Sequence, residues 1–161
     1  ANTVQLGKNE AVIYVSIHAN ASFNKNARGF EVWYLNPEYR RKLVDGEGAA
    51  GTDKEILPIL NLMLEEEFTT ESVLLAKRIL DNLGAMIGAV SPSRGLRAEE
   101  WFVVRNAKMP SVLVELGFVT NALDALLLGQ EDHLRKLGDG IYTGIVDFVE
   151  YFENRKGSAA P

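Results

Sequence analysis

Two short apolar runs, far apart in the sequence, constrain the fold of this chain most strongly. Residues Ala11–Ile17 and Ser111–Leu116 carry Val, Ile and Leu at successive positions. Apolar side chains on both sides of an extended segment are typical of strands buried on both faces, as in a parallel sheet. An ionisable residue lies at the end of each run: His18 follows the first run, and Glu115 is the next-to-last residue of the second. We therefore expect a sheet with polar side chains at its strand ends.

Two further strands are expected. The segment 29–35 is apolar around a single glutamate and stops at an Asn-Pro pair, a combination that ends a strand. The run 101–104 is the second of these strands. The segments expected between the strands are a short helix at 38–44, a flexible loop at 46–52 and a turn at 91–95.

Apolar residues recur at helical spacing through most of the middle of the chain. One helix begins at Asp53 and closes with Glu65-Glu66-Glu67. The polar stretch 69–72 interrupts the pattern and supplies N-cap residues for a longer helix. Apolar residues at helical spacing mark that second helix: Leu75, Ile79, Leu83 and Met86.

The last third of the chain is also predicted to be helical. Asn121 can cap a short helix that ends at Leu128, with Asp124 completing a partial capping box. A longer helix runs from Glu131 to about Phe152. One apolar face of that helix is formed by Leu134, Leu137, Ile141, Ile145, Phe148 and Phe152.

Strands interleaved with helices predict an α/β fold, with a mostly parallel twisted sheet and helices on both faces. The chain length of 161 residues fits one domain, which we place at 1–154 with a flexible tail at 155–161.

Composition narrows the function classes. The net charge is −5, which argues against a nucleic-acid-binding domain. No uncharged apolar run approaches the ~20 residues that span a bilayer. The chain has no cysteine and two histidines, which excludes disulfides and thiolate metal sites. A metal could be held only by histidine and carboxylates.

His18 and Glu115 are the candidate catalytic or metal-binding residues. Ligands of open α/β sheets bind beyond the carboxyl ends of the strands, so parallel neighbouring strands would place both residues in one cleft. Taken alone, His18 could equally be a strand-end histidine bonded to a loop. A buried Glu115 needs a partner, a metal or a catalytic use.

The remaining ionisable candidates have simpler interpretations. His133 has no partner at metal-ligand spacing and is interpreted as a solvated residue on the outer side of a helix. Glu65, Glu66 and Glu67 are interpreted as a solvated helix end, although carboxylates are mildly unfavourable at a helix C-terminus. Phosphate-loop, dinucleotide, His-Glu-X-X-His and serine-hydrolase motifs are absent, which argues against those activities.

Several motifs together resemble a known family. Ser16–Ala21 and Pro110–Asn121 closely resemble the signatures of the zinc-dependent N-acetylmuramoyl-L-alanine amidases, cell-wall hydrolases of the third amidase class. Gly29–Leu35, Arg94–Leu96 and Phe102–Arg105 fit the same family, and the similarity runs from about residue 1 to 152. Two long motifs in the right order are more specific than either alone.

The resemblance implies a role for each matching residue. His18 would be a zinc ligand, and Glu115 the catalytic carboxylate that moves a proton from water to the leaving amine. Asn20 and Arg105 would contact substrate, although a structural turn role for Asn20 is equally plausible. The substrate would be the amide between N-acetylmuramic acid and L-alanine in peptidoglycan.

The chain departs from the family pattern at its start. Family members hold zinc with three protein ligands, two of which precede the first motif, and residues 1–10 contain no histidine. We therefore expect the opening strand–helix portion to be missing. On its own, this chain should be inactive or hold zinc weakly.

The segment 46–70 resembles an insertion that occludes the zinc cleft in regulated family members. Glu65, Glu66 or Glu67 could then be autoinhibitory by placing a carboxylate on the metal. An ordinary surface helix is an equally good interpretation of the same residues.

The sequence is therefore compatible with two functions. The first is a zinc amidase that acts in cell-wall remodelling or daughter-cell separation. The alternative is a catalytically incomplete, amidase-like module that binds peptidoglycan or regulates a partner. Either function implies a periplasmic or extracellular monomer, with peptidoglycan and an activator protein as partners and without nucleic acid or a membrane span.

Overall fold

The computed structural model describes residues 1–7, 10–44 and 55–158. The expected loop at 46–52 lies outside them. None of the helices within the described residues is long and apolar enough to cross a membrane. The elements, in chain order, are β1 (Tyr14–Asn20), β2 (Phe30–Leu35), α1 (Leu57–Ile87), β3 (Ser93–Glu99), α2 (Phe102–Arg105), β4 (Ser111–Phe118), α3 (Ala122–Leu128) and α4 (Glu131–Ser158).

The four strands form one mixed sheet in the order β1-β4-β2-β3. The pairs β1–β4 and β2–β3 are parallel, whereas β2 and β4 are antiparallel where the two pairs meet. The predicted α/β fold is thus confirmed, with parallel pairing as the commoner kind. β1 is less buried than predicted, because it lies at the edge of the described sheet; Ile17 is 53% exposed.

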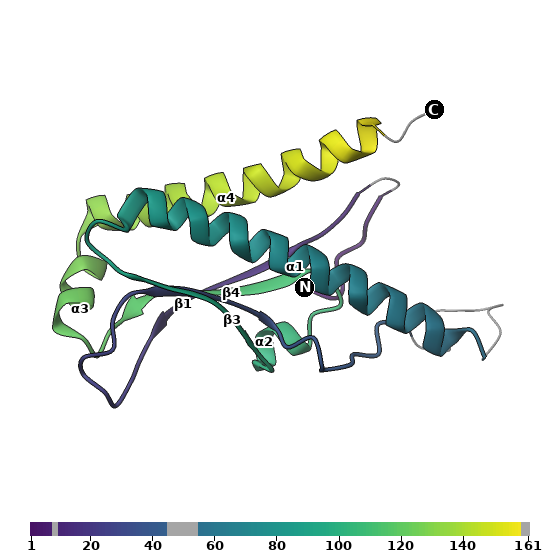
Figure 1. Cartoon of the computed structure of the whole chain (residues 1–161), viewed down its shortest axis with the longest axis horizontal. Coiled ribbons are helices and arrows are strands. Elements are labelled where there is room, and N and C mark those ends of the chain that lie inside the picture. Colours follow the sequence, from purple (N-terminus) through teal and green to yellow (C-terminus); the bar gives the residue numbers. More distant parts are fainter. Residues whose placement is uncertain (8–9, 45–54, 159–161) are drawn as a thin grey trace.

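The main core lies between one face of the sheet and the helices α1 and α4, which run side by side over it (Figure 1). Its buried residues come from both layers: Phe30, Val32, Leu75, Ala76, Ile79, Leu83, Ile87, Val112, Val114, Leu137, Ile141 and Phe148. The two helices approach closely at Gly144, where an added Cβ would lie 2.6 Å from the Cα of Ile79.

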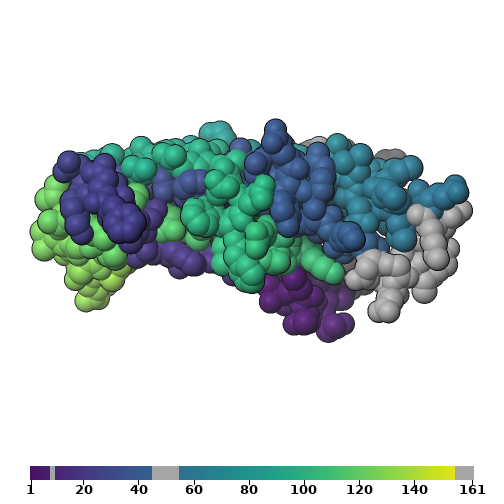
Figure 2. Space-filling view, turned by 90° about the horizontal axis from the view of Figure 1, so that it is seen from below, coloured from purple at the N-terminus to yellow at the C-terminus, as the bar shows by residue number. Residues whose placement is uncertain are grey.

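The opposite face of the sheet is only partly covered. Here α2 packs Val104 against Leu35 and Leu113 in a second, smaller cluster. Figure 2 shows the molecule from this side, with α2 near the middle of the view. Helices therefore lie on both faces, as predicted, but with very unequal cover.

The predicted break at 69–72 is wrong, because α1 continues through it. The Thr70 hydroxyl donates to the carbonyl of Glu66 at 2.8 Å, and the Ser72 hydroxyl donates to the carbonyl of Phe68 at 2.6 Å. These hydroxyls bond back to the preceding turn of the same helix instead of capping a new one.

The short apolar run after β3 was also mispredicted. The run 101–104 was predicted to be a strand, but residues 102–105 form α2. Periodicity cannot separate a strand from a helical turn in so short an apolar run.

The segment 38–44 is not helical. Its amides at Leu43 and Val44 donate to the Asn61 side chain of α1 at 2.7 and 2.9 Å, so tertiary partners replace helical ones.

The C-terminal helices confirm most of the prediction. Asn121 caps α3 by accepting from the amides of Leu123 and Asp124. The capping box is not completed, because the Asp124 carboxylate accepts from the amides of Gly29 and Phe118 instead. The final helix α4 continues to Ser158.

Two positions on α4 were assigned wrongly. Leu134 was placed on the apolar face but is 46% exposed, and His133 was placed on the solvated side but is 6% exposed. α4 contacts α3, and Asp124 of α3 lies near enough to His133 to act on its pKa. That contact covers a position that an isolated helix would leave in solvent.

Candidate active site on the open sheet face

His18, Glu115 and Glu31 form a row across three adjacent strands. His18 of β1 pairs with Glu115 of β4, and Glu115 pairs with Glu31 of β2. Residues that pair directly across neighbouring strands project from the same face. That face is the one opposite α1 and α4, since Val32 and Val114, the next residues along, belong to the main core. The expected proximity of His18 and Glu115 is therefore present.

Glu31 is the most heavily bonded member of the row. Its side chain is 2% exposed and lies 2.8 Å from Nε of Arg94 and 2.8 Å from Nε of Arg97. Asn20 donates to its other oxygen at 2.9 Å. These partners supply opposite charge and hydrogen bonds to the buried carboxylate. It also fixes two arginines and one amide beside Glu115.

The two arginines are held from a second side by aromatic rings. The guanidinium of Arg94 lies 4.9 Å from the ring centre of Phe118, and that of Arg97 lies 5.5 Å from the ring centre of Trp33. Cation–π contacts of this length hold a guanidinium in place. The cluster is thus preorganised by contacts on two sides.

Glu115 is electrostatically different from Glu31. Burial, followed by the charge of Glu31, raises the pKa of Glu115 to about 7. Its Oε2 is buried and has no hydrogen-bond partner among the described residues. A carboxyl group with a pKa near neutrality can accept a proton and release it again, which is the requirement for general base and acid catalysis. Of the two carboxylates, Glu115 is the chemically available one.

His18 is exposed, and its Nε2 lies 2.8 Å from the hydroxyl of Ser16. Its imidazole can therefore be oriented by a neighbour on its own strand. Imidazole nitrogen is a common zinc ligand. No group of three His, Asp or Glu side chains that could hold a metal ion occurs in the described part of the chain. Because a zinc site needs at least three protein ligands, the described residues do not fit a complete one.

The other predicted site residues lie elsewhere. Arg105 is on α2, stacked over Phe102 at 5.7 Å, and does not belong to the row. The Glu65 carboxylate is buried against Arg41 at 2.7 Å. Glu66 and Glu67 are exposed on α1, the helix that covers the opposite face of the sheet.

Sequence reasoning missed Glu31, Arg94 and Arg97 as site residues. Glu31 could have been found, because it interrupts an apolar strand as Glu115 does and therefore needs partners. Arg94 lies in a stretch that resembles the family, but neither arginine interrupts an apolar strand as the two glutamates do. The arginines lie on β3, which begins where a turn was predicted and whose polar residues conceal a strand.

Comparison with known proteins gives the family. Residues 1–147 match the Amidase_3 family, described as N-acetylmuramoyl-L-alanine amidase. An uncharacterized cell wall amidase of Bacillus anthracis is 33% identical over 144 residues, which are 89% of this chain and 22% of that protein. The amidase AmiA of Salmonella typhimurium is 27% identical over 163 residues, 92% of this chain and 56% of that protein.

Solved structures show the same fold. The catalytic domain of CwlV, an N-acetylmuramoyl-L-alanine amidase from Bacillus (Paenibacillus) polymyxa, matches with a TM-score of 0.61 and 24% identity, over 86% of this chain and 57% of that one. The chain thus spans between about a fifth and somewhat over half of the length of these proteins. Because the family match extends over nearly the whole sequence, this chain belongs to the Amidase_3 family of N-acetylmuramoyl-L-alanine amidases.

Proposed function

We propose that this chain is the part of a peptidoglycan amidase that supplies its catalytic carboxylate. The reaction is hydrolysis of the amide between N-acetylmuramic acid and L-alanine. The observation that carries the proposal is Glu115, a carboxyl group with a pKa near 7 on the open face of the sheet beside His18. Family membership supports the choice of substrate.

Glu115 acts in both halves of the reaction. As a carboxylate it takes a proton from the attacking water while the water oxygen bonds to the amide carbon. As an acid it gives that proton to the amide nitrogen when the carbon–nitrogen bond breaks. The neighbouring Glu31 favours the first of these transfers, because its charge raises the pKa of Glu115 and so makes the carboxylate a stronger base.

The zinc dependence of the family is also a proposal for this protein, with His18 as one ligand. Zinc would polarise the amide carbonyl and activate the water. The described residues supply only part of a ligand set. Asn20, held by Glu31, is proposed to orient the loop that follows His18, and Arg105 is proposed to contact substrate.

The test is Glu115→Gln in the intact protein. Hydrolysis of purified peptidoglycan is measured through the release of free amino termini. Gln keeps the size of the side chain but cannot carry the proton, so turnover should fall about 10²–10⁴-fold. Sedimentation with insoluble peptidoglycan should stay at the wild-type level. The matched control is Glu150→Gln, an exposed carboxylate on α4, which should keep full turnover. A Glu115→Gln protein with normal turnover contradicts the proposal.

One observation favours a second function, an amidase-like module that binds peptidoglycan without cleaving it. The described residues contain no group of three His, Asp or Glu side chains that could together hold a metal ion. The same experiment separates the two functions, because a binding module has no turnover to lose and binds peptidoglycan in both forms.

Location and regulation are proposed from the family. Action on peptidoglycan places the protein in the cell envelope, periplasmic or extracellular. The solved CwlD amidase of Clostridioides difficile is in complex with the GerS lipoprotein, which supports an activator protein as a partner here. We also propose a regulatory role for segment 46–70, in which Glu65 is bonded to Arg41.

A further inference from the structure

Asp124 of α3 is a buried carboxylate that lies outside the catalytic row. Its side chain is 2% exposed. Its Oδ2 accepts hydrogen bonds from the amides of Gly29, at 2.7 Å, and Phe118, at 3.0 Å, and its Oδ1 lies 3.5 Å from Nε of Arg28. Gly29 immediately precedes β2, and Phe118 is the last residue of β4. One oxygen atom therefore joins two strands at the end of the sheet where α3 lies (Figure 1).

The joined strands are the two that carry the carboxylates of the row. Glu31 lies two residues after Gly29, and Glu115 lies three residues before Phe118. The antiparallel pairing of β2 with β4 ends at the Glu31–Glu115 pair. Beyond that pair, both strand ends are bonded to Asp124. The spacing of the two strand ends beside the row therefore depends on this carboxylate.

Phe118 is also linked to Glu31 through two other side chains. The ring centre of Phe118 lies 4.9 Å from the guanidinium of Arg94, whose Nε donates to Oε2 of Glu31 at 2.8 Å. On the neighbouring strand β1, Asn20 pairs with Phe118 and donates to Oε1 of Glu31 at 2.9 Å. A shift of Phe118 would therefore move two of the partners that hold Glu31 in the row.

The backbone at both joined strand ends contains a glycine with positive φ. Gly29 has a φ of 100° and Gly117 a φ of 151°. Glycine has the least restricted backbone of all residues, so bonds from outside the segment contribute more to fixing its position. A Cβ at Gly117 would lie 3.3 Å from Oδ2 of Asp124. The end of β4 therefore also packs directly against the carboxylate.

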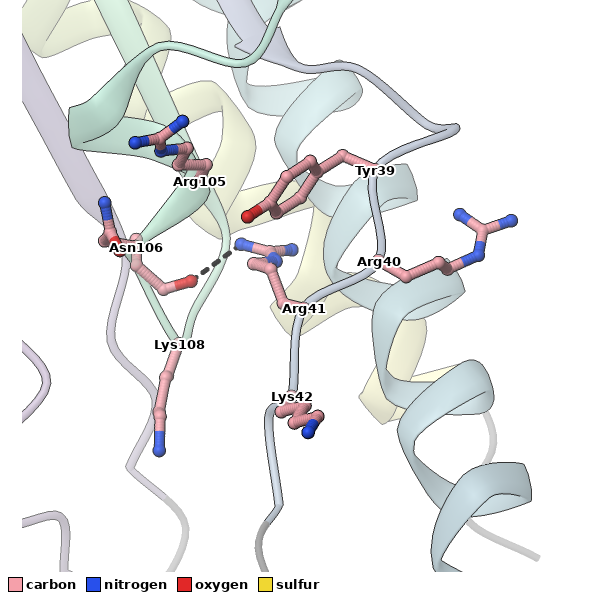
Figure 3. A pocket seen from close by; sticks show the side chains of 8 residues that line it. Tyr39, Arg40, Arg41, Lys42, Arg105, Asn106 and Lys108 are labelled. Atoms are coloured by element: carbon pink, nitrogen blue, oxygen red, sulfur yellow. Dashed lines mark hydrogen bonds between the residues drawn. The ribbon is translucent and has the colours of Figure 1, made fainter.

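A second buried carboxylate, Glu65, joins the same two strands at their opposite ends. Arg41, which follows β2, donates to Glu65 from Nη2 at 2.7 Å. Its Nη1 donates at 2.7 Å to the carbonyl of Ala107, which precedes β4, at the pocket in Figure 3. The catalytic row lies at the other end of the strand pair. Of the two carboxylates, Asp124 is therefore the one placed to control the row.

We propose that Asp124 is a positioning residue of the amidase, which fixes the ends of β2 and β4 so that Glu31 and its partners lie beside Glu115. The proposal rests on the proposed peptidoglycan amidase function. Asp124 is too deeply buried to contact substrate and acts through the strands that it joins. Because catalytic groups must be held in one geometry, a misplacement of about 1 Å can lower turnover about 10²-fold.

The test compares Asp124→Ala with Asp124→Asn in the intact protein. Ala leaves both amides without their acceptor, whereas Asn keeps one oxygen that can accept from both. In hydrolysis of a soluble muramoyl peptide, the Ala variant should lose about 10²-fold in kcat with little change in KM. The Asn variant should keep most of the wild-type kcat. Full kcat in the Ala variant, or equally low kcat in both variants, contradicts the proposal.

A spectroscopic measurement separates positioning from a general loss of structure. The Nε–H signal of Arg94 in proton–nitrogen NMR spectra reports on its contact with Glu31. This signal should shift in Asp124→Ala and stay near its wild-type position in Asp124→Asn. An unshifted Arg94 signal in the Ala variant would overturn the proposal even if kcat falls.

The matched control is Asp147→Ala on the closed side of the sheet. The Asp147 carboxylate accepts from Nδ2 of Asn82 at 2.8 Å and joins α4 to α1, so its removal also breaks a bond between elements. This variant should keep the wild-type kcat and the wild-type Arg94 signal. Equal losses of kcat in the two Ala variants overturn the proposal, because destabilisation alone then explains them.

Asp124→Glu provides a second measurement if Asp124→Ala does not fold. It keeps the charge and both oxygens but is longer by one methylene group, so it displaces the strand ends. We expect kcat to fall about tenfold and the Arg94 signal to shift. Wild-type values of both overturn the proposal.

The wild-type protein separates this proposal from the proposed function. If the wild type does not cleave the muramoyl peptide, the proposed function fails. If the wild type cleaves it and Asp124→Ala cleaves it equally well, only the proposal for Asp124 fails.

Discussion

The two faces of the sheet are built from the same strands but differ in burial and in the kind of side chain they carry. On β2, Phe30 and Val32 are fully buried beneath α1 and α4, whereas Glu31 between them faces the other way and binds two arginines. Alternation along a strand assigns neighbouring residues to opposite faces. One face is closed by helices and carries stability, and the other is left partly open and carries the ionisable groups.

This difference shows how the fold separates packing from chemistry. The closed face tolerates little change in volume, because protein interiors are close-packed. The open face stores electrostatic free energy instead, since Glu115 is kept beside Glu31 at a raised pKa. Substitutions on the two faces should therefore differ in how their effects depend on pH.

The largest expected effect on stability is from Gly144→Ala on the closed side. The new Cβ would lie 2.6 Å from the Cα of Ile79, so α1 and α4 must move apart. We expect a loss of about 1–3 kcal/mol in the free energy of unfolding, independent of pH. Gly138→Ala on the same helix meets nothing within 4 Å and should be neutral or stabilising by up to ~1 kcal/mol. Urea unfolding of both variants tests this, and equal stabilities would refute the close contact.

The second prediction concerns Glu115→Gln on the open face and is pH-dependent. The folded-state pKa of Glu115, about 7, lies above the ordinary glutamate value of 4.5, so the folded protein binds the proton more tightly. The wild type should lose stability as the pH rises from about 4.5 to 7. The variant lacks this loss and should be more stable above pH 7, by about 1 kcal/mol once solvent screening is allowed for.

Urea unfolding of metal-free protein at pH 4.5 and pH 8 measures this difference. Wild type and variant should be close at the lower pH and diverge at the higher one. A constant difference between them would show that the Glu115 carboxyl is not perturbed in the folded protein.

The smallest expected effect is from His133→Gln beside α3. Burial and Lys136 lower the pKa of His133, although Asp124 acts in the opposite direction. The unfolded chain therefore binds the proton more tightly, and the wild type loses stability as the pH falls below 6.5. The variant should show a shallower loss between pH 7 and pH 5 in thermal unfolding. An unchanged slope would mean that His133 is solvated, as its sequence context had suggested.

The strands of the site could be predicted because their signal is local. The runs that became β1, β2 and β4 are apolar and β-branched, and the family motifs around His18 and Glu115 are contiguous. β3 could not be predicted in the same way. Its Arg94 and Arg97 are stabilised in the sheet by ion pairs with Glu31. Glu31 is more than sixty residues away from them in the sequence.

The same limit explains the mispredicted segments. Thr70 and Ser72 have the composition of a helix start, but inside α1 their hydroxyls bond to the preceding turn, and Ser72 also accepts from the amide of Ser111 at 2.9 Å. Glu65 resembled a free carboxylate until the fold placed Arg41 against it. For Ser72 and Glu65, a partner distant in the sequence decided between two local possibilities.

The sequence alone determined the α/β class, the family, and His18 and Glu115 as the residues to examine. These properties follow from short-range patterns of apolar and polar residues that the chain carries wherever it folds. Only the tertiary structure decided that Glu31 shares the site and that Glu65 belongs to a buried ion pair. Those properties depend on which strands and loops become neighbours, and electrostatic interactions act through space rather than along the chain.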